Sequence, residues 1–237
     1  MSSKLLLPLV LAATLLPSAS HAAEPEAWTF EVSLYGLAAG MSGDVVVKGV
    51  PADVDLGFDQ ILDNLELGAM GKIRVGHGQW ALTADIIYME LGASKNGVSV
   101  DFEQWVVEPS LSYRFNPNLE VLAGARYNRL DASITGPFSI DPSSTESWWD
   151  PIVGANVSLP LGEKFSFNMR GDIGGFNVGS DLTWQAFPSV SWQFANAWSL
   201  NAGYRWVYTD YSNGSGTDEF KYDILTQGPQ LGVTYQF

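Results

Sequence analysis

The stretch that decides the fold is LTWQAFPSVSWQFANAWSLNAGYRW, from Leu182 to Trp206. It contains two runs in which apolar or aromatic residues alternate with small or polar ones, joined by Ala195-Asn196-Ala197. Because successive side chains of a strand point to opposite faces, this pattern predicts a β-hairpin with one apolar side. Each run exceeds the roughly five or six residues of a typical soluble strand and reaches the roughly 9 to 11 with which a tilted strand crosses a bilayer. We therefore predict a transmembrane β-barrel.

The N-terminal residues predict export. Lys4 precedes the apolar run LLLPLVLAATLLP, and Ser20-His21-Ala22 offers small residues for cleavage. Residues 1–22 are therefore interpreted as a secretory signal peptide and residues 23–237 as the barrel domain. A transmembrane helix is the competing interpretation, but the apolar run is short and is interrupted by two prolines. An exported chain without a helical anchor is expected in the periplasm, the outer membrane or the medium.

The composition agrees with a barrel. Hydrophobic residues make up 46% of the chain and aromatic residues 13%, whereas charged residues make up only 16%, against about 25% in an average soluble domain. An apolar lipid face combined with a polar lumen gives such a balance. Cleavage of the predicted signal peptide would remove Lys4 and leave 11 of the 12 basic residues. Against 26 acidic residues, this gives a formal charge of −15. This charge argues against a nucleic-acid partner, and the absence of cysteine excludes disulfides and thiol chemistry.

Alternation along the mature chain predicts a single antiparallel barrel of ten strands, with eight as the fallback if the first hairpin is misassigned. Residues 41–60, rich in glycine and aspartate and containing Pro51, are expected to form the longest irregular segment, followed by a short helical turn within 59–65. Pro109 is expected to mark a bulge. Polar loops are expected at 92–97 and 132–147. The ten strands are expected at about 28–40, 65–75, 80–88, 105–115, 119–128, 149–161, 165–173, 182–194, 198–208 and 220–237.

The connections between these strands alternate in length. Short ones near residues 77, 117, 163 and 196 alternate with connections near 50, 95, 140 and 215 that are longer. This is the arrangement of barrels with short periplasmic turns and longer extracellular loops. It places both termini of the barrel on the periplasmic side.

The last residues carry the most specific signal. Leu231, Val233, Tyr235 and Phe237 recur at every second position up to a terminal aromatic residue. This ending resembles that of bacterial outer-membrane barrels, in which the barrel assembly machinery reads it. The resemblance implies that these four residues form the assembly signal.

Longer segments resemble one particular group of proteins. WWDPIVGANVSLPL, RGDIGGFNVGSDLTW, NAGYRWVYTDY and GPQLGVTYQF are similar to segments of a family of small Gram-negative outer-membrane barrels, related to the OmpA-type barrel superfamily. The resemblance covers most of the mature chain. It implies fold and location, and it carries no activity or substrate with it.

Charged residues within the predicted strands share the inward parity. Two interpretations follow: the side chains fill the lumen as a network of ion pairs, or they line a charge-selective pore. We favour the filled lumen, in which the arginines pair with the carboxylates, because barrels of about eight strands are filled by side chains whereas open channels need about 16 strands. The predicted lumenal network consists of Lys72, Arg74, Asp85, Glu108, Arg114, Arg126, Arg170, Asp172 and Arg205.

Acidic residues concentrate in the predicted outer loops. Oxygen ligands suit calcium and magnesium ions, which bridge lipopolysaccharide. A solvated loop surface is the interpretation we favour, because the spacing matches no calcium-loop pattern. No metal site or cofactor is therefore predicted. The residues are Asp53, Asp55, Asp59, Asp63, Asp141, Glu146, Asp218 and Glu219.

Histidine is the residue on which an enzymatic barrel would depend, because a general base works best near neutral pKa. His21 lies in the predicted signal peptide and His77 lies between glycines in a predicted periplasmic turn. Asp85 and Glu108 form a carboxylate pair, but neighbouring basic residues favour ion pairing over catalysis. The sequence therefore predicts a protein without enzymatic activity.

Together these patterns predict an integral outer-membrane β-barrel, a membrane-integrity protein or a narrow conduit for small solutes. The alternative is a surface adhesin or ligand-binding barrel that acts through its extracellular loops, especially residues 41–60. The expected partners are outer-membrane lipid, lipopolysaccharide and the barrel assembly machinery, and the barrel is expected to be a monomer.

Overall fold

The computed structural model describes residues 27–95, 98–135 and 143–237. The predicted signal peptide lies outside these residues. Strands account for nearly all of the described chain, and none of its helices is long and apolar enough to cross a membrane. The elements are β1 (Trp28–Leu37), β2 (Gly40–Val47), β3 (Val50–Leu56), α1 (Phe58–Asp63), β4 (Leu65–His77), β5 (Trp80–Lys95), β6 (Val98–Asn116), β7 (Leu119–Thr135), β8 (Ser143–Pro160), β9 (Phe165–Gly175), β10 (Leu182–Ala195), β11 (Trp198–Asn213), η1 (Gly216–Asp218) and β12 (Phe220–Gln236).

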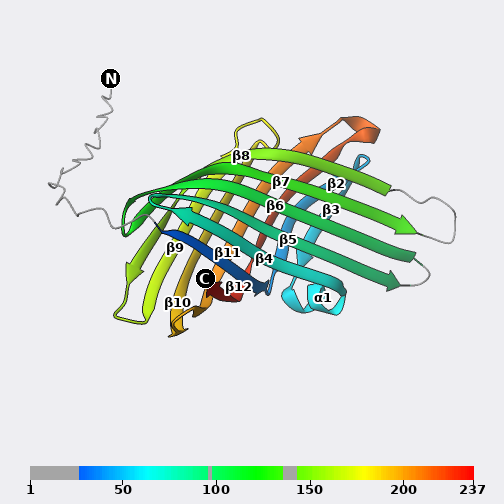
Figure 1. Cartoon of the computed structure of the whole chain (residues 1–237). Helices are drawn as coiled ribbons and strands as arrows, with labels where there is room; N and C mark the ends of the chain where they lie inside the picture. The colour runs from blue at the N-terminus through cyan, green and yellow to red at the C-terminus, as the bar shows by residue number, and fades with distance from the viewer. Residues whose placement is uncertain (1–26, 96–97, 136–142) are drawn as a thin grey trace, which may run out of the picture.

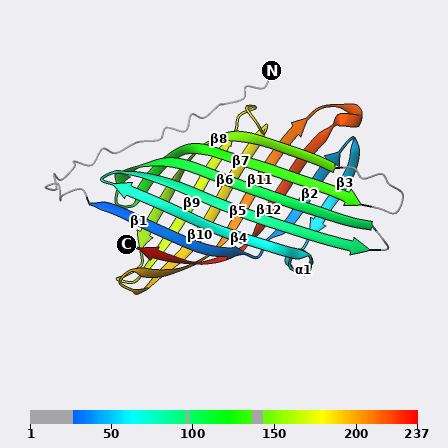
Figure 2. The same cartoon turned by 45° about the vertical axis from the view of Figure 1, so that its right-hand side comes forward.

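Ten of the strands form a closed antiparallel barrel. Its order is β1-β4-β5-β6-β7-β8-β9-β10-β11-β12, and β12 pairs with β1 from Glu31↔Gln236 to Leu37↔Gln230. The strands run obliquely across the barrel (Figures 1 and 2). The prediction of an all-β fold with a ten-stranded antiparallel barrel is confirmed.

Residues 41–60 are not irregular, which corrects the prediction. They form the β2–β3 hairpin and the start of α1, which matches the predicted helical turn. β2 continues the direction of β1 beyond Ala38 and pairs with the other half of β12, from Gln227 to Phe220. Lys48 and Gly49 both have positive φ values, 51° and 75°, as a tight two-residue hairpin turn requires. Proline is tolerated at position 51 because β3 is an edge strand.

Two other predictions of irregular structure are also wrong. The predicted polar loops at 92–97 and 132–147 are largely strand, because β5 extends to Lys95, β7 extends to Thr135 and β8 begins at Ser143; residues 96–97 and 136–142 lie outside the described part. The predicted bulge at Pro109 is absent, since Pro109 pairs with Ala84 in an unbroken register.

Two belts of aromatic side chains mark the expected membrane boundaries. The lower belt lies at the end with the short turns and includes the ring contacts Trp80–Tyr113, at 4.9 Å, and Trp198–Tyr235, at 4.7 Å. The upper belt includes Tyr88–Trp105, Tyr127–Trp149, Trp184–Tyr208 and Tyr204–Trp206, with ring centroids 4.4 to 6.2 Å apart. Trp80 and Tyr88 lie eight residues apart on β5. At about 3.4 Å per residue and a tilt of about 40°, this separation corresponds to roughly 20 Å along the barrel axis, close to the apolar band of about 25 Å in such barrels.

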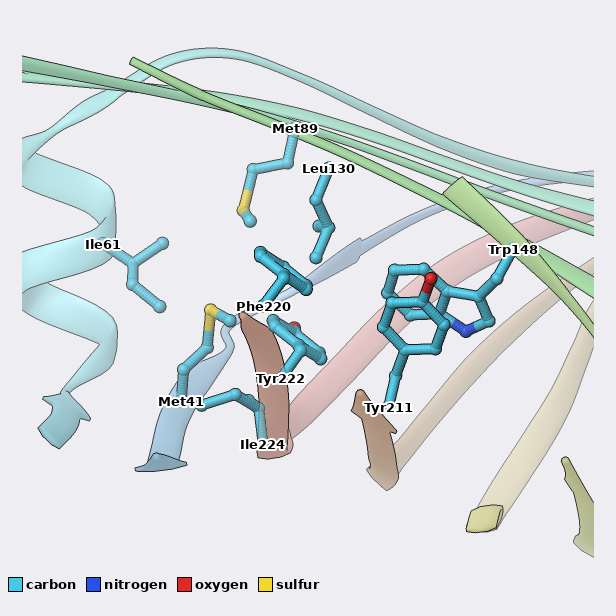
Figure 3. Packing of buried hydrophobic residues seen from close by; sticks show 9 residues of the cluster. All are labelled: Met41, Ile61, Met89, Leu130, Trp148, Tyr211, Phe220, Tyr222 and Ile224. Atoms are coloured by element: carbon cyan, nitrogen blue, oxygen red, sulfur yellow. The ribbon is translucent and has the colours of Figure 1, made fainter. Parts of the chain in front are cut away.

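A hydrophobic cluster fills the lumen towards the upper belt (Figure 3). Trp148 stacks on Tyr211 with ring centroids 3.9 Å apart, and Ile61 of α1 packs into the same cluster. Val45, Val47 and Val54 of the β2–β3 hairpin pack against it, which explains why this hairpin folds despite its glycines and aspartates. The cluster consists of Met41, Ile61, Met89, Leu130, Trp148, Tyr211, Phe220, Tyr222 and Ile224.

Candidate functional site in the barrel lumen

The charged residues enter the lumen because the strand period of two assigns every second residue to the inner face. Cross-strand pairing then brings several of them to the same height: Asp85 lies opposite both Lys72 and Glu108, and Asp172 lies opposite Gln185. All nine side chains of the predicted lumenal network line the lumen or are buried inside it.

The centre of the network is the buried Arg126. Its side chain is 1% exposed, and its Nη2 atom lies 2.7 Å from both Glu108 Oε2 and Asp172 Oδ1. It also donates a hydrogen bond to Thr183 Oγ1 at 2.9 Å. Arg170 contacts the same two carboxylates, with its Nε atom 3.0 Å from Asp172 Oδ2. Two arginines and two carboxylates therefore neutralise one another at mid-height.

A second group lies beside this centre. Arg205 Nε and Nη2 donate hydrogen bonds to Gln185 Oε1 at 2.9 and 2.6 Å, and Arg205 Nη1 lies 3.5 Å from Asp85 Oδ2. Tyr35 donates a hydrogen bond to Asp85 and accepts one from Arg205 Nη1 at 3.2 Å. Buried polar groups of this kind are stable only when each has a partner.

Arg74 pairs differently from the prediction, which assigned it to Asp85, Glu108 or Asp172. It donates to both carboxylate oxygens of Glu120, at 3.1 and 2.5 Å, and its side chain is 19% exposed. Lys72, opposite Asp85, and Arg114 also line the lumen, and neither forms a salt bridge within 4.0 Å in the described part of the chain.

Below the network the lumen widens into a polar vestibule of about 720 Å³. It reaches the short turns near Asn116, Gly162 and Asn196 and ends upward at Arg170 and Arg205. Above the network a cavity of only about 60 Å³ lies beneath the hydrophobic cluster. The lumen is therefore open at the end with the short turns near Asn116, Gly162 and Asn196 and filled from mid-height upward, first by ion pairs and then by apolar side chains.

Four further residues of the lumen were not among those predicted from the sequence. Tyr35, Gln185 and Glu120 have the inward parity of their strands, and this parity was the available signal. Asp150 is fully buried and accepts hydrogen bonds from the Ser180 backbone N–H at 2.6 Å and from Ser180 Oγ at 2.8 Å. These bonds hold the connection between β9 and β10 onto β8.

Four of the acidic residues beyond the upper belt form a row across neighbouring strands. Asp53, Asp44, Asp223 and Asp210 lie opposite one another across β3, β2, β12 and β11. Burial raises the pKa of the Asp210 carboxyl, and the neighbouring Asp223 carboxylate raises it further. Within the described ranges no three histidine or acidic side chains are arranged to hold a metal ion; Asp141 lies outside them.

The predicted assembly residues lie on the strand that closes the barrel. Tyr235 and Val233 pair with Val32 and Leu34 of β1. The Tyr235 ring lies 4.7 Å from the Phe237 ring, and Phe237 and Leu231 are exposed on the outer face. The terminal aromatic residue therefore belongs to the lower belt.

His77 lies at the end of β4 that carries the short turn, and its ring stacks on Trp28 at 4.5 Å. The centre of the lumen contains arginines paired with carboxylates. The arrangement can stabilise a filled barrel, and it offers no neutral base beside a nucleophile.

Comparisons with known proteins support the fold. No known protein family and no curated protein matches the sequence. Among solved structures, the outer-membrane protease OmpT from Escherichia coli matches with a TM-score of 0.54 at 9% identity, over 89% of this chain and 97% of that chain. Ail, the attachment invasion locus protein of Yersinia pestis, matches with a TM-score of 0.43 at 12% identity, over 90% and 99%. Neisserial surface protein A matches with a TM-score of 0.37 at 15% identity, over 89% and 97%.

The closed antiparallel barrel and the match to OmpT define the class. The chain has the fold of a Gram-negative outer-membrane β-barrel. At such low identity a shared fold carries no activity from one protein to another, and the resemblance to the OmpA-type superfamily stays a prediction.

Proposed function

We propose that this protein is a non-enzymatic integral outer-membrane barrel that acts as a closed membrane-integrity protein. The observation that carries the proposal is the filled lumen: the ion pairs around Arg126 lie beneath an apolar cluster around Trp148 and Tyr211. A narrow conduit for small solutes is disfavoured because water and ions would have to cross both layers.

Several features support the outer membrane as the location. The two aromatic belts are separated by a distance that fits a bilayer, and residues 1–22 are predicted to be a signal peptide. The exposed apolar side chains between the belts, such as Leu82 and Ile73, suit contact with lipid and not with water.

Planar-bilayer recordings test the closed lumen. The reconstituted parent protein is expected to give no reproducible conductance steps. Reproducible steps whose reversal potential changes in Arg126→Ala or Arg205→Ala would instead show that the lumen conducts and that these arginines select its ions.

A deletion strain tests the integrity role. Loss of the protein is expected to increase sensitivity to bile-salt detergents. The parent gene and the folded variant Arg74→Ala, which changes only the vestibule, should both restore resistance. Unchanged sensitivity of the deletion strain would contradict the integrity role while leaving the closed lumen untouched.

A surface adhesin or ligand-binding barrel is the second candidate. One observation favours it: β5, β6, β7 and β8 continue beyond the upper belt, together with the β2–β3 hairpin (Figure 1). These extensions form a protruding surface. Binding of intact cells to host-matrix polymers should then fall when the hairpin tip at Lys48-Gly49 is replaced, with barrel assembly unchanged.

A further inference from the structure

One section of the barrel wall is not closed by strand pairing. Within the described residues, β3 pairs only with β2, and the upper part of β4, from Leu65 to Met70, pairs only with β5. Eight residues, 57–64, connect these two strands and contain α1. An unpaired strand edge cannot face hydrocarbon without losing hydrogen bonds, so this section needs its own explanation.

The upper belt gives the height of the unpaired section. Ala69 of β4 pairs with Tyr88 of the upper belt. On the other side of the section, Ser42 of β2 pairs with Leu225 of β12, and Leu225 pairs with Tyr208 of the belt. Because Ser42 pairs with Asp55, nearly all of β3 lies at or above the belt. The edge of β3 and the end of β4 above Ala69 are therefore placed in the headgroup region, with α1 at the boundary to the lipid. The edge of β1 from Tyr35 to Leu37, which pairs with β12 but not with β4, lies lower in the wall.

Helix α1 takes the place of paired strands in this wall. Ile61 is 5% exposed and points into the lumenal cluster near Met41 and Met89 (Figure 3), whereas Phe58 and Leu62 are 43% and 52% exposed. The side-chain hydrogen bonds of the helix stay within its own segment, as in Gly57 N–H to Gln60 Oε1 at 2.8 Å. A backbone bond from Gly92 to Asn64 at 2.9 Å holds its C-terminal end on β5. Ile61 is thus the side chain that anchors α1 to the lumen.

The cavity of about 60 Å³ lies behind this section. Its lining includes Met41, Met70 and Met89, three of the five methionines of the chain, while Arg126 and Arg205 belong to its polar part. Methionine side chains are flexible and adapt to guests of different shape. The apolar part of this cavity has room for a xenon atom or a very short alkyl group, and a larger guest requires the methionine side chains to move.

We propose that α1 is a lateral gate through which a small apolar molecule passes from the outer leaflet into the methionine-lined cavity. The membrane is the source because the network around Arg126 separates the cavity from the vestibule and the cluster covers it from above. The outward face of α1, with Phe58 and Leu62, is itself apolar and meets the lipid boundary. This inference goes beyond the integrity role and does not depend on it.

The chain has no cysteine, so a single Val207→Cys substitution places one thiol in the cavity lining. In lipid vesicles, uncharged methyl methanethiosulfonate is expected to modify this thiol, and the cationic trimethylammonium analogue is expected to react far more slowly. Xenon, as the probe guest, is small enough for the cavity and should slow modification because it occupies the space beside the thiol. Equal rates for both reagents, or no protection by xenon, would overturn the proposal.

A matched pair of substitutions on α1 tests the gate. Ile61→Ala removes the anchor and should raise the rate of modification by the uncharged reagent on the order of tenfold, since truncating a buried isoleucine weakens its packing. Leu62→Ala makes a similar truncation on the exposed side and should leave the rate unchanged. Equal rates in the two variants would refute the gate. Heat-modifiable gel mobility checks folding, and Ile61→Val provides a milder second variant with a smaller increase in the same direction.

Discussion

Arg126→Ala is the substitution that tests the lumenal network most directly. It removes the guanidinium that lies 2.7 Å from both Glu108 and Asp172. Both carboxylates then depend on Arg170 alone, and Thr183 loses the donor to its hydroxyl. Because the Glu108 side chain is 2% exposed, water cannot replace the missing charge without local opening of the barrel.

The expected magnitude follows from burial. Removing one partner of a buried ion pair costs about 3 to 5 kcal/mol, and the remaining contacts of Arg170 place this change near about 3 kcal/mol. Arg74→Ala is the matched control, because its pair with Glu120 faces the vestibule, where water solvates the abandoned carboxylate. About 1 kcal/mol or less is expected there.

Urea-induced unfolding in lipid vesicles, followed by tryptophan fluorescence, measures both variants under one condition. The difference of about 2 kcal/mol between them corresponds to roughly a 30-fold change in the unfolding equilibrium. If Arg126→Ala loses no more stability than Arg74→Ala, the lumen at mid-height is wet and the filled-lumen interpretation is wrong.

Three further substitutions test other parts of the molecule. Phe237→Ala should lower the amount of inserted barrel in cells, measured by heat-modifiable mobility, although it removes at most about 3 kcal/mol of burial; normal insertion would count against the assembly signal. Ser180→Ala removes a hydrogen bond to the buried Asp150 and should cost roughly 1.5 to 3 kcal/mol in the unfolding assay; an unchanged free energy of unfolding would show that water replaces the hydroxyl. Because the pKa of Asp210 is raised in the folded state, the folded protein binds this proton more readily than the unfolded chain. Stability should therefore rise as the pH falls from neutral towards the ordinary aspartate range, and Asp210→Asn should remove part of this rise; an identical pH dependence in the variant would contradict the assignment.

The alternation of side chains along each strand, with a period of two residues, is the signal from which the barrel strands and their inward charges could be predicted. Between the two belts one face meets lipid and the other meets the lumen, so a one-residue error in parity would have turned charged residues such as Arg126 and Asp172 towards lipid. Ten strands and the inward charges could be predicted for this reason. Strand parity does not predict which lumenal charges form ion pairs, because the ion pairs depend on side-chain rotamers and on which strands face one another across the lumen. Arg74 accordingly forms its ion pair with Glu120 and not with a residue of the predicted set.

Above the upper belt the same signal fails. The outer face of the strands there no longer meets lipid, so alternation weakens and polar strands resemble loops. The β2–β3 hairpin shows a second limit: Val45 and Val54 pack against a cluster in which four of the nine residues come from β11 and β12, more than 150 residues along the chain. The residues of the hairpin do not predict its contact with this distant cluster, and Pro51 and the glycines within 41–60 argue against a strand.

The pairing of β12 with both β1 and β2 has a consequence for the order of assembly. Glu31 meets Gln236, a separation of 205 residues, so the most non-local pairing in the barrel joins its first strand to the last one synthesised. Contacts of such separation form late and slowly. Since β12 also pairs with β11 along its whole length, a nascent chain that ends before Phe220 exposes strand edges on β1, β2 and β11 at once. We expect ribosome-released fragments of this kind to stay bound to chaperones in the periplasm, and only the full-length chain to leave them for the membrane.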